Sequence, residues 1–265
     1  MAFAQAENRR PIFGAVATLG VSDRVNFLRK TYAHLGAALI AFAVITGGLI
    51  RFAPSVSWGF SKWALQGWTW LLVIGLFMVV GYIAERLARS ETSRGLQYAG
   101  LGLAVAAEAF LLQPLLWVLM LKFGVYSKGD VAMMLAGNAT PYMSGKAGSI
   151  LLSATVITLA IFIGLTLTVF LTKKDFTFMR GALSIASFAV LGIILVSILF
   201  GFHLGALFCG AVILLMSGYI LYQTSLIMRD FPPSAHVAAA LMLFSTIATL
   251  FWYVLQLLME LASDR

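Results

Sequence analysis

Polar residues in two apolar stretches of this sequence could do chemistry. Glu108 lies within LAVAAEAFLLQPLLW, where Gln113 follows it, and Gln223, Thr224 and Ser225 form a polar step within SGYILYQTSLIMRD. A carboxylate can take up a proton or bind a cation, whereas an amide and hydroxyls can only form hydrogen bonds. Because polar groups inside membrane-length apolar segments are costly and commonly functional, these residues are the first candidates for a site.

The composition indicates a membrane protein. The 265 residues are 61% hydrophobic and 11% charged, and the mean hydropathy is +0.96. Soluble domains use about 45–50% apolar and about 25% charged residues. Apolar runs of about 20 residues, the length that crosses a bilayer core, occupy almost the whole chain. We therefore predict an all-α integral membrane protein without a separate soluble domain.

Hydropathy and charge breaks predict a bundle of seven transmembrane helices. The predicted spans cover approximately residues 31–51, 66–86, 96–121, 148–172, 181–201, 204–228 and 236–260. They form one transmembrane domain, residues 31–261, which follows a cytoplasmic tail of residues 1–30. The Gly, Asn, Pro and Ser content of the segment Lys122–Lys146 predicts an aqueous loop.

The basic residues predict the orientation of the bundle. If the N-terminus is cytoplasmic, twelve of the 18 Lys and Arg residues lie on the inner side, and the other six are Arg51, Lys62, Lys122, Lys128, Lys146 and Arg265. Inner loops of membrane proteins carry the excess of positive charge, so we predict the N-terminus inside and the C-terminus outside. The net charge of +8 then faces lipid headgroups. The sequence contains no basic stripe interleaved with aromatic residues, which would indicate nucleic-acid binding.

The sequence offers no catalytic constellation. His34 and His236 fall near the inner ends of predicted helices and His203 falls in an outer turn, so the three cannot converge on one metal ion. There is no nucleophile motif, phosphate-binding glycine loop or dinucleotide fingerprint. The single Cys209 lies in an apolar span and can form no intramolecular disulfide. We predict no enzyme activity, no cofactor and no metal site.

Glu108 is expected near the middle of the membrane. A helix that starts near residue 96 places it about 18 Å along the span, and Pro114 removes a backbone donor shortly after it. The helix should therefore bend or open near residues 110–114. At this depth an isolated carboxylate either holds a proton or lines a wet cavity. A structural hydrogen bond and a role in ion or proton handling are both compatible with the sequence.

Three motifs are distributed along the chain: FLRKTYAHLGAAL at Phe27–Leu39, LTKKDFTFMRGAL at Leu171–Leu183 and SGYILYQTSLIM at Ser217–Met228. Together they resemble the Bax inhibitor-1 family of small seven-span membrane proteins. The loop motif that begins Lys173-Lys174-Asp175 is the most specific of the three. The resemblance covers essentially the whole chain after the tail, and the number and order of spans agree.

The family resemblance separates two branches. In one branch, an Asp in the sixth span and an Asp in the seventh are thought to sense pH and gate a calcium leak. The resemblance places Gln223 and Thr246 at these two positions, so both carboxylates are absent here. An amide and a hydroxyl could form a hydrogen bond between the helices, but they cannot titrate or supply the charge that calcium favours.

The other branch, from bacteria, lacks the acidic pair and is represented by a protein that binds and restrains a membrane-embedded AAA protease in membrane-protein quality control. The resemblance therefore implies a non-enzymatic regulator of the bacterial inner membrane, with the lipid bilayer and such a protease as partners. Two alternatives stay open. One is a calcium or proton leak that uses Glu108 and Gln113, and the other is a structural subunit of a larger membrane complex. The oligomeric state is not predicted.

Overall fold

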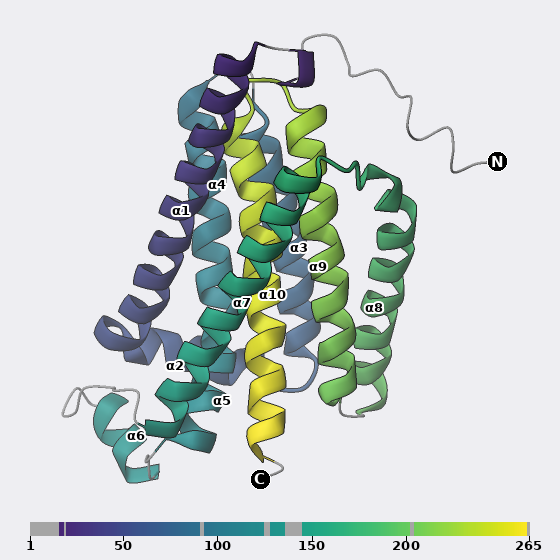
Figure 1. The fold of residues 1–265 in the computed structure, drawn as a ribbon. Coiled ribbons are helices and arrows are strands. Elements are labelled where there is room, and N and C mark those ends of the chain that lie inside the picture. Colours follow the sequence, from purple (N-terminus) through teal and green to yellow (C-terminus); the bar gives the residue numbers. More distant parts are fainter. Residues whose placement is uncertain are drawn as a thin grey trace.

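The computed structural model describes residues 16–18, 20–90, 93–124, 128–135, 145–201 and 204–263. In these residues the secondary structure is entirely helical (Figure 1). The elements are η2 (Val16–Thr18), α1 (Val21–Phe52), α2 (Pro54–Ala64), α3 (Thr69–Ala88), α4 (Arg94–Leu111), α5 (Gln113–Phe123), α6 (Lys128–Leu135), α7 (Gly145–Thr172), η3 (Thr177–Met179), α8 (Arg180–Phe200), α9 (Ala206–Arg229) and α10 (His236–Ser263). Within the described ranges, seven spans are long and apolar enough to cross a membrane, which confirms the predicted class.

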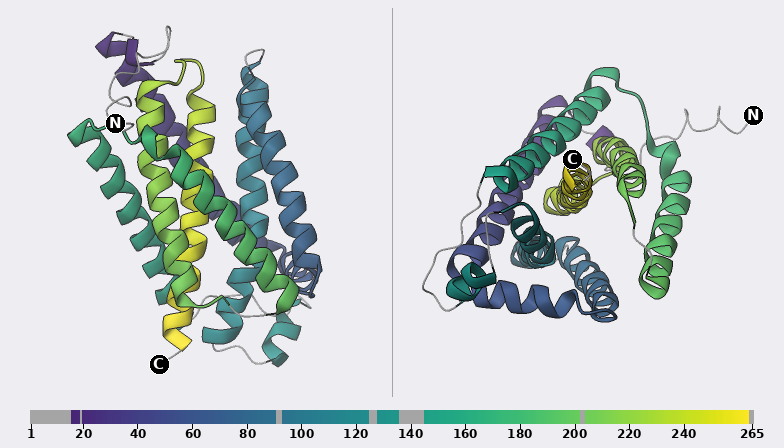
Figure 2. Two further views of the ribbon diagram at one scale, coloured as in Figure 1. Left: turned by 90° about the vertical axis from the view of Figure 1, so that its right-hand side faces the viewer. Right: turned by 90° about the horizontal axis from the view of Figure 1, so that it is seen from below.

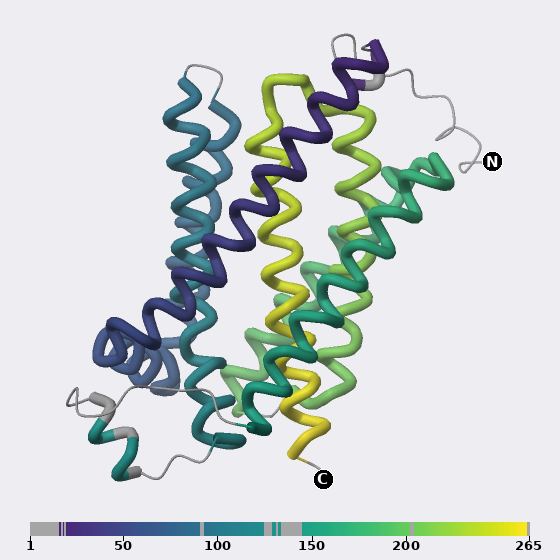
Figure 3. The backbone as a smooth tube through the Cα atoms, turned by 60° about the vertical axis from the view of Figure 1, so that its left-hand side comes forward, coloured from purple at the N-terminus to yellow at the C-terminus, as the bar shows by residue number. Residues whose placement is uncertain are grey.

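The spans run alternately between the two ends of the bundle (Figures 1 and 3). We call the end that carries Arg89, Lys173 and Arg229 the basic end, and the end at which α10 finishes at Ser263 the C-terminal end. Helix α1 begins at the basic end and α10 finishes at the C-terminal end, as an odd number of spans requires. That the basic end faces the cytoplasm stays a prediction from the charge distribution.

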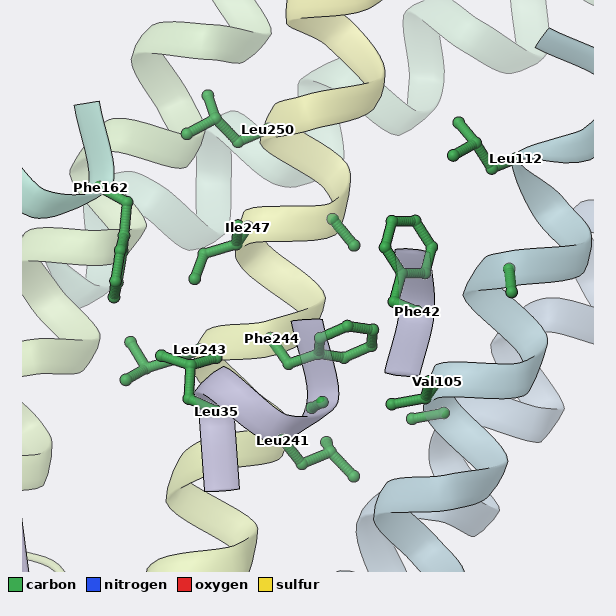
Figure 4. Packing of buried hydrophobic residues seen from close by; sticks show 14 of the residues in the cluster. Leu35, Phe42, Val105, Leu112, Phe162, Leu241, Leu243, Phe244, Ile247 and Leu250 are labelled. Carbon is green, nitrogen blue, oxygen red and sulfur yellow. The ribbon is translucent and has the colours of Figure 1, made fainter. Parts of the chain in front are cut away.

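Helix α10 forms the centre of the bundle, and the other spans surround it (Figure 2). In its most apolar window 67% of the residues are buried, against 6% for the span that contains α8. Phe244 of α10 is fully buried and its ring meets Phe42 of α1 edge to face, with 5.8 Å between the ring centroids (Figure 4). Aromatic pairs of this geometry add to the packing free energy beyond their buried area.

Helix α8 lies at the periphery, where it packs mainly on α9 and η3. Its side chains Ile185, Phe188 and Phe200 are 73%, 73% and 79% exposed. In water such a surface would be costly, but in a bilayer it faces acyl chains of the same polarity. The exposed apolar surface of α8 therefore fits a lipid-facing span.

The first helix differs from its predicted bounds. It begins at Val21 and not near residue 31, so residues 21–30, predicted as tail, belong to α1. At 32 residues α1 is about 48 Å long, which exceeds the roughly 30 Å of a bilayer core, so its polar first turns extend beyond the apolar layer. Residues 1–15 and 19 of the predicted tail lie outside the described residues.

Two short helices occupy segments that were predicted as connections. Helix α2 lies across the C-terminal end of the bundle (Figure 2), begins with Pro54 and buries Ser57, Ser61 and Ala64. Proline is favourable at a first helical position, where its missing N–H is not needed. Helix α6 lies within the predicted Lys122–Lys146 loop. The prediction missed both because neither segment is long enough to show a transmembrane hydropathy signal.

The predicted disruption of the third span is present. Helix α4 ends at Leu111 and α5 begins at Gln113, directly before Pro114. The polar side chains that stabilise this break also attach α2 to the bundle. Ser57 Oγ donates to Gln113 Oε1 at 2.7 Å, and Gln113 Nε2 donates to the carbonyl oxygen of Ala109 at 2.7 Å. A carbonyl near the helix break thus receives a side-chain donor in place of a backbone one.

Candidate functional site

Glu108 lies at the junction of two cavities. A cavity of about 420 Å³ extends from it toward the basic end, between α3, α4, α9 and α10. A second cavity of about 730 Å³ extends toward the C-terminal end and is also lined by α5 and α8. Phe77, Met78, Glu108 and Thr249 line both cavities. Because Glu108 is near the midpoint of the span Arg94–Phe123, the junction lies at mid-membrane depth.

The carboxylate of Glu108 has no hydrogen-bond or ion-pair partner among the residues that the structure describes, although the residue is only 8% exposed. A buried ionised carboxylate without a partner is costly, so at this site it must either hold a proton or be hydrated through the cavities. Both states are what a proton-carrying group requires. The sequence was equally compatible with a structural hydrogen bond at Glu108, but the described residues form no such bond with its side chain.

Gln223 and Thr246 are in direct contact on the wall of the first cavity. Thr246 Oγ1 donates to Gln223 Oε1 at 2.9 Å, between α9 and α10. Both side chains are 7% exposed and both line the cavity that reaches Glu108. The two positions that the family resemblance aligned with an acidic pair are therefore facing neighbours, held by a neutral hydrogen bond.

Polar groups recur along the two cavities from one end to the other. At the mouth near the basic end, Arg89 forms an exposed salt bridge of 2.8 Å with Glu85. On α10, Thr246 and Thr249 lie one turn apart, and Gln256 follows two turns later on the wall of the second cavity. Sequence analysis missed this stripe, although its spacing of three and seven residues was a readable signal for one helix face.

Gln113 lies in a different environment from Glu108. It is fully buried, and Ser57, which donates to it, in turn accepts a hydrogen bond of 2.7 Å from Trp117 Nε1. Both the oxygen and the nitrogen of its amide are used in this network. Of the two intramembrane residues proposed to handle ions, Gln113 is therefore engaged in hydrogen bonds at the helix break, whereas Glu108 lines the two cavities.

The loop motif Lys173-Lys174-Asp175 connects α7 to α8 at the basic end. Asp175 accepts a hydrogen bond of 2.8 Å from the backbone N–H of Thr177 and forms an ion pair with Arg229 at the end of α9. The backbone N–H of Phe176 donates to Ser225 Oγ at 3.2 Å. Two residues of the polar step of α9 therefore have different roles: Gln223 lines the cavity, and Ser225 accepts a hydrogen bond from the loop.

Two of the three histidines meet at the basic end. The rings of His34 and His236 are 5.0 Å apart between centroids, and His34 Nε2 is hydrogen-bonded to Tyr98 Oη at 3.1 Å. His203 lies outside the described residues. Within the described part of the chain no group of three or more His, Cys, Asp or Glu side chains could hold a metal ion. Cys209 is completely buried.

Comparison with known proteins gives a consistent identification. The profile of the family described as "Inhibitor of apoptosis-promoting Bax1" matches residues 24–263. The chain is 29% identical to "Bax inhibitor 1" of Schizosaccharomyces pombe over 248 residues, which cover 92% of this chain and 79% of the relative. It is 34% identical over 111 residues to "Uncharacterized protein PA2604" of Pseudomonas aeruginosa, covering 42% of this chain and 50% of that protein. No solved structure matches.

The profile match spans every transmembrane helix, from the first turn of α1 to the end of α10. It includes the three motifs on which the sequence resemblance rested, and the relative from fission yeast matches 92% of the chain. The chain therefore belongs to the Bax inhibitor-1 family of integral, multi-pass membrane proteins.

Proposed function

We propose that the chain provides a proton leak across the membrane, with Glu108 as the central proton-carrying group. The observation that carries the proposal is the junction of the two cavities at this carboxylate, at mid-membrane depth. Ionisable groups inside transmembrane segments commonly mark ion and proton pathways when they line a cavity. The stripe of Thr246, Thr249 and Gln256 supplies further polar groups on either side for water to bridge.

A proton fits the junction better than a calcium ion. Calcium takes six to eight oxygen ligands, several of them carboxylates. Glu108 is the single carboxylate among the lining residues that the two cavities share. A single carboxylate is sufficient for proton transfer because it needs only to bind and release one proton.

Proton uptake by proteoliposomes containing the purified chain tests the proposal. With a potassium diffusion potential as the driving force, a pH-sensitive dye inside the vesicles should report uptake above that of empty liposomes. Uptake equal to that of empty liposomes would contradict the leak. The same vesicles loaded with a calcium indicator separate proton from calcium permeation.

Modulation of a membrane-embedded AAA protease is the second candidate function. It is supported by the neutral Gln223–Thr246 hydrogen bond at the positions of the acidic pair, a replacement shared with the bacterial branch that the sequence resembles. In this function the chain acts without catalysis, as a docking partner in the bacterial inner membrane. A mild-detergent pull-down identifies the partner, and a stoichiometric complex without a protease would instead favour a structural subunit.

Deletion of residues 1–15 is expected to relieve inhibition of such a protease if the tail engages it. The deletion should stop there, because the backbone N–H of Val16 donates to the carbonyl oxygen of Phe231 at 2.9 Å and Val16 is 1% exposed. A longer deletion reaching Phe27 would remove a core side chain and confound the result. The measurement is the degradation of a membrane substrate by the reconstituted protease. If the deletion leaves degradation unchanged, this role of the tail is excluded.

A double substitution tests the correspondence with the acidic pair. In Gln223→Asp with Thr246→Asp, two carboxylates face each other where the side chains now form a 2.9 Å hydrogen bond. Like charges at this distance cannot both ionise readily, so the pair should retain a proton at neutral pH. We expect tryptophan fluorescence or proton flux to change with pH between about 5 and 8.

The matched control is the uncharged pair Gln223→Asn with Thr246→Asn, which should show only the pH dependence of the unsubstituted chain. An identical pH response of both folded double variants would show that the two positions do not form a titrating pair.

A further inference from the structure

Helix α2 carries polar side chains on its inner face and apolar ones on its outer face. Ser57 and Ser61 are buried against the bundle. Val56 and Trp63 are seven residues apart, so they share one face of the helix, and they are 54% and 41% exposed. A helix at a water-exposed surface shows the opposite polarity. The outer face of α2 therefore suits an apolar neighbour.

The position of α2 places this face at the perimeter of the bundle. Seen from below, α2 lies at the edge, between the end of α1 and the start of α3 (Figure 2). Both neighbouring helices expose apolar side chains, among them Val44 of α1 and Leu72 of α3. Among the described helices, α2 packs on α1, α3, α5 and α6. Its outer face therefore continues the lipid-facing surface of the bundle.

The depth of α2 is that at which the apolar layer ends. Residues 31–50 of α1 contain no Lys, Arg, Asp or Glu, and they extend about 30 Å along the helix, the thickness of a hydrocarbon core. Arg51 ends this stretch, and α2 begins three residues later at Pro54. Because α2 lies across the bundle, it stays at the level between acyl chains and headgroups.

The residues at this level match the chemistry of phospholipid headgroups. Residues 50–68 contain Arg51, Lys62 and three tryptophans, and no Asp or Glu. Lys62 lies beside Trp63 on the outer face, and Trp68 is exposed directly before α3. Tryptophan is enriched at the headgroup level, and a lysine stem can follow an apolar surface while its ammonium reaches a phosphate. The segment therefore complements a phosphate layer in charge as well as in polarity.

Hydrogen bonds hold the inner face of α2 against the third span. Ser57 Oγ donates to Gln113 Oε1 and accepts from Trp117 Nε1, both at 2.7 Å. The rings of Trp58 and Trp117 meet edge to face, with 5.0 Å between their centroids. These contacts fix which face of α2 points away from the bundle.

We propose that α2 is an in-plane anchor that binds the phospholipid headgroups of the leaflet at the C-terminal end. Val56 and Trp63 lie at the boundary of the acyl chains, and the ammonium of Lys62 contacts the phosphates. Short amphipathic helices with this combination of apolar and cationic side chains bind in the plane of the membrane. A soluble partner does not suit this face, because lipid of the same leaflet surrounds the edge on which α2 lies.

Electron paramagnetic resonance of a spin label on α2 tests the proposal in the full chain, reconstituted into vesicles of phosphatidylcholine and phosphatidylglycerol. The label is attached to Val56→Cys in a Cys209→Ala background. Oxygen concentrates among the acyl chains and a water-soluble nickel complex in the aqueous phase, so their collision rates with the label report its depth. We expect the label on the apolar side of the phosphates, within about 10 Å of them. Gly59→Cys offers a second position on the same face, since no atom lies within 4 Å of a Cβ built there.

Val156→Cys on α7 and Asp23→Cys on α1 are the matched references. Val156 is exposed to nearly the same extent as Val56, 57% against 54%, and lies near the middle of its helix, so its label should be deeper. Asp23 lies in the first turn of α1, beyond the apolar layer, so its label should meet the nickel complex freely. A label at Val56 as accessible to the nickel complex as that at Asp23 would overturn the proposal in favour of a face free for a soluble partner. Protection from both reagents would also overturn it, because protein then covers the face.

Lys62→Glu tests the contact with the phosphates. One cation near an anionic membrane surface changes binding about fivefold, so the charge reversal should raise the water-exposed population of the label at Val56 by that factor or more. Lys62→Arg, which keeps the charge, should leave the label in place. An unchanged collision rate in Lys62→Glu would overturn the phosphate contact. Because depth is measured without flux, failure of this proposal is distinguishable from failure of the proton leak.

Discussion

Glu108→Gln is expected to reduce proton flux in proteoliposomes by about 100-fold or more, the lower range of effects when a proton-transferring group is removed. The glutamine amide keeps the shape and hydrogen-bonding capacity of the side chain, but it cannot bind and release a proton at neutral pH. Since no described residue is bonded to the Glu108 carboxylate, the substitution breaks no contact within the described structure. Folding should be preserved, and thermal stability should remain equal to that of the unsubstituted chain or rise slightly.

Two variants make this result specific. Asp23→Asn removes a carboxylate from the exposed first turn of α1, outside both cavities, and should leave the flux unchanged. Glu108→Asp retains a titratable group about one methylene shorter and should retain part of the flux. Flux that persists fully in a folded Glu108→Gln variant would remove Glu108 from the pathway and overturn its role as the proton-carrying group.

Gly100→Ala is expected to destabilise the bundle by about 3 kcal/mol or to prevent its assembly, because the position admits no side chain. A Cβ at Gly100 would lie 2.5 Å from the carbonyl oxygen of Ala84 and 2.6 Å from the backbone nitrogen of Ala88. Both atoms belong to the backbone of α3, so no side-chain rotation can relieve the overlap. The helices would have to separate, and close packing between them is what holds membrane helices together.

Gly102→Ala provides the matched control on the same helix. No atom lies within 4 Å of a Cβ built at Gly102, so this variant should unfold at the same temperature or slightly higher. Unfolding followed by size-exclusion chromatography after heating in mild detergent measures both variants. Equal midpoints for the two alanine variants would show that α3 and α4 are not in backbone contact at Gly100.

The pairing of α3 and α4 also affects the site. Ala104, Ala107 and Glu108 of α4 line the first cavity opposite Phe77 and Gly81 of α3. A separation of these helices at Gly100 would widen that cavity at its mouth near the basic end. Proton flux through any folded Gly100→Ala protein is therefore expected to exceed that of the unsubstituted chain, in contrast to the loss expected for Glu108→Gln.

Some parts of the site could be predicted from residue types. Pro114 predicted the interruption of the third span because a proline ring is incompatible with an unbroken helix. Once the family resemblance had aligned Gln223 and Thr246, a neutral hydrogen bond between them was a possibility, and the two side chains form it. In both cases the signal lies in the chemistry of one residue or one pair, and this does not depend on how the rest of the bundle is arranged.

Other features could not be predicted because they depend on neighbours distant in sequence. Gln113 was proposed with Glu108 as an ion-handling residue, but Ser57 of α2, 56 residues earlier, donates a hydrogen bond to its amide oxygen. Short helices such as α2 give no transmembrane signal, so neither the helix nor its contact with Gln113 was visible in the hydropathy pattern.

Hydropathy alone identifies the chain as a seven-span membrane protein, because the cost of unpaired backbone groups in lipid leaves helices as the available structure for these segments. Whether an intramembrane polar group faces protein or a cavity depends on how the helices pack. When a helix is apolar on all sides, the sequence pattern does not show which neighbour a polar residue on it will contact. Glu108 acquires its surroundings from α3, α9 and α10, which pack beside α4 to leave two cavities that meet at its carboxylate.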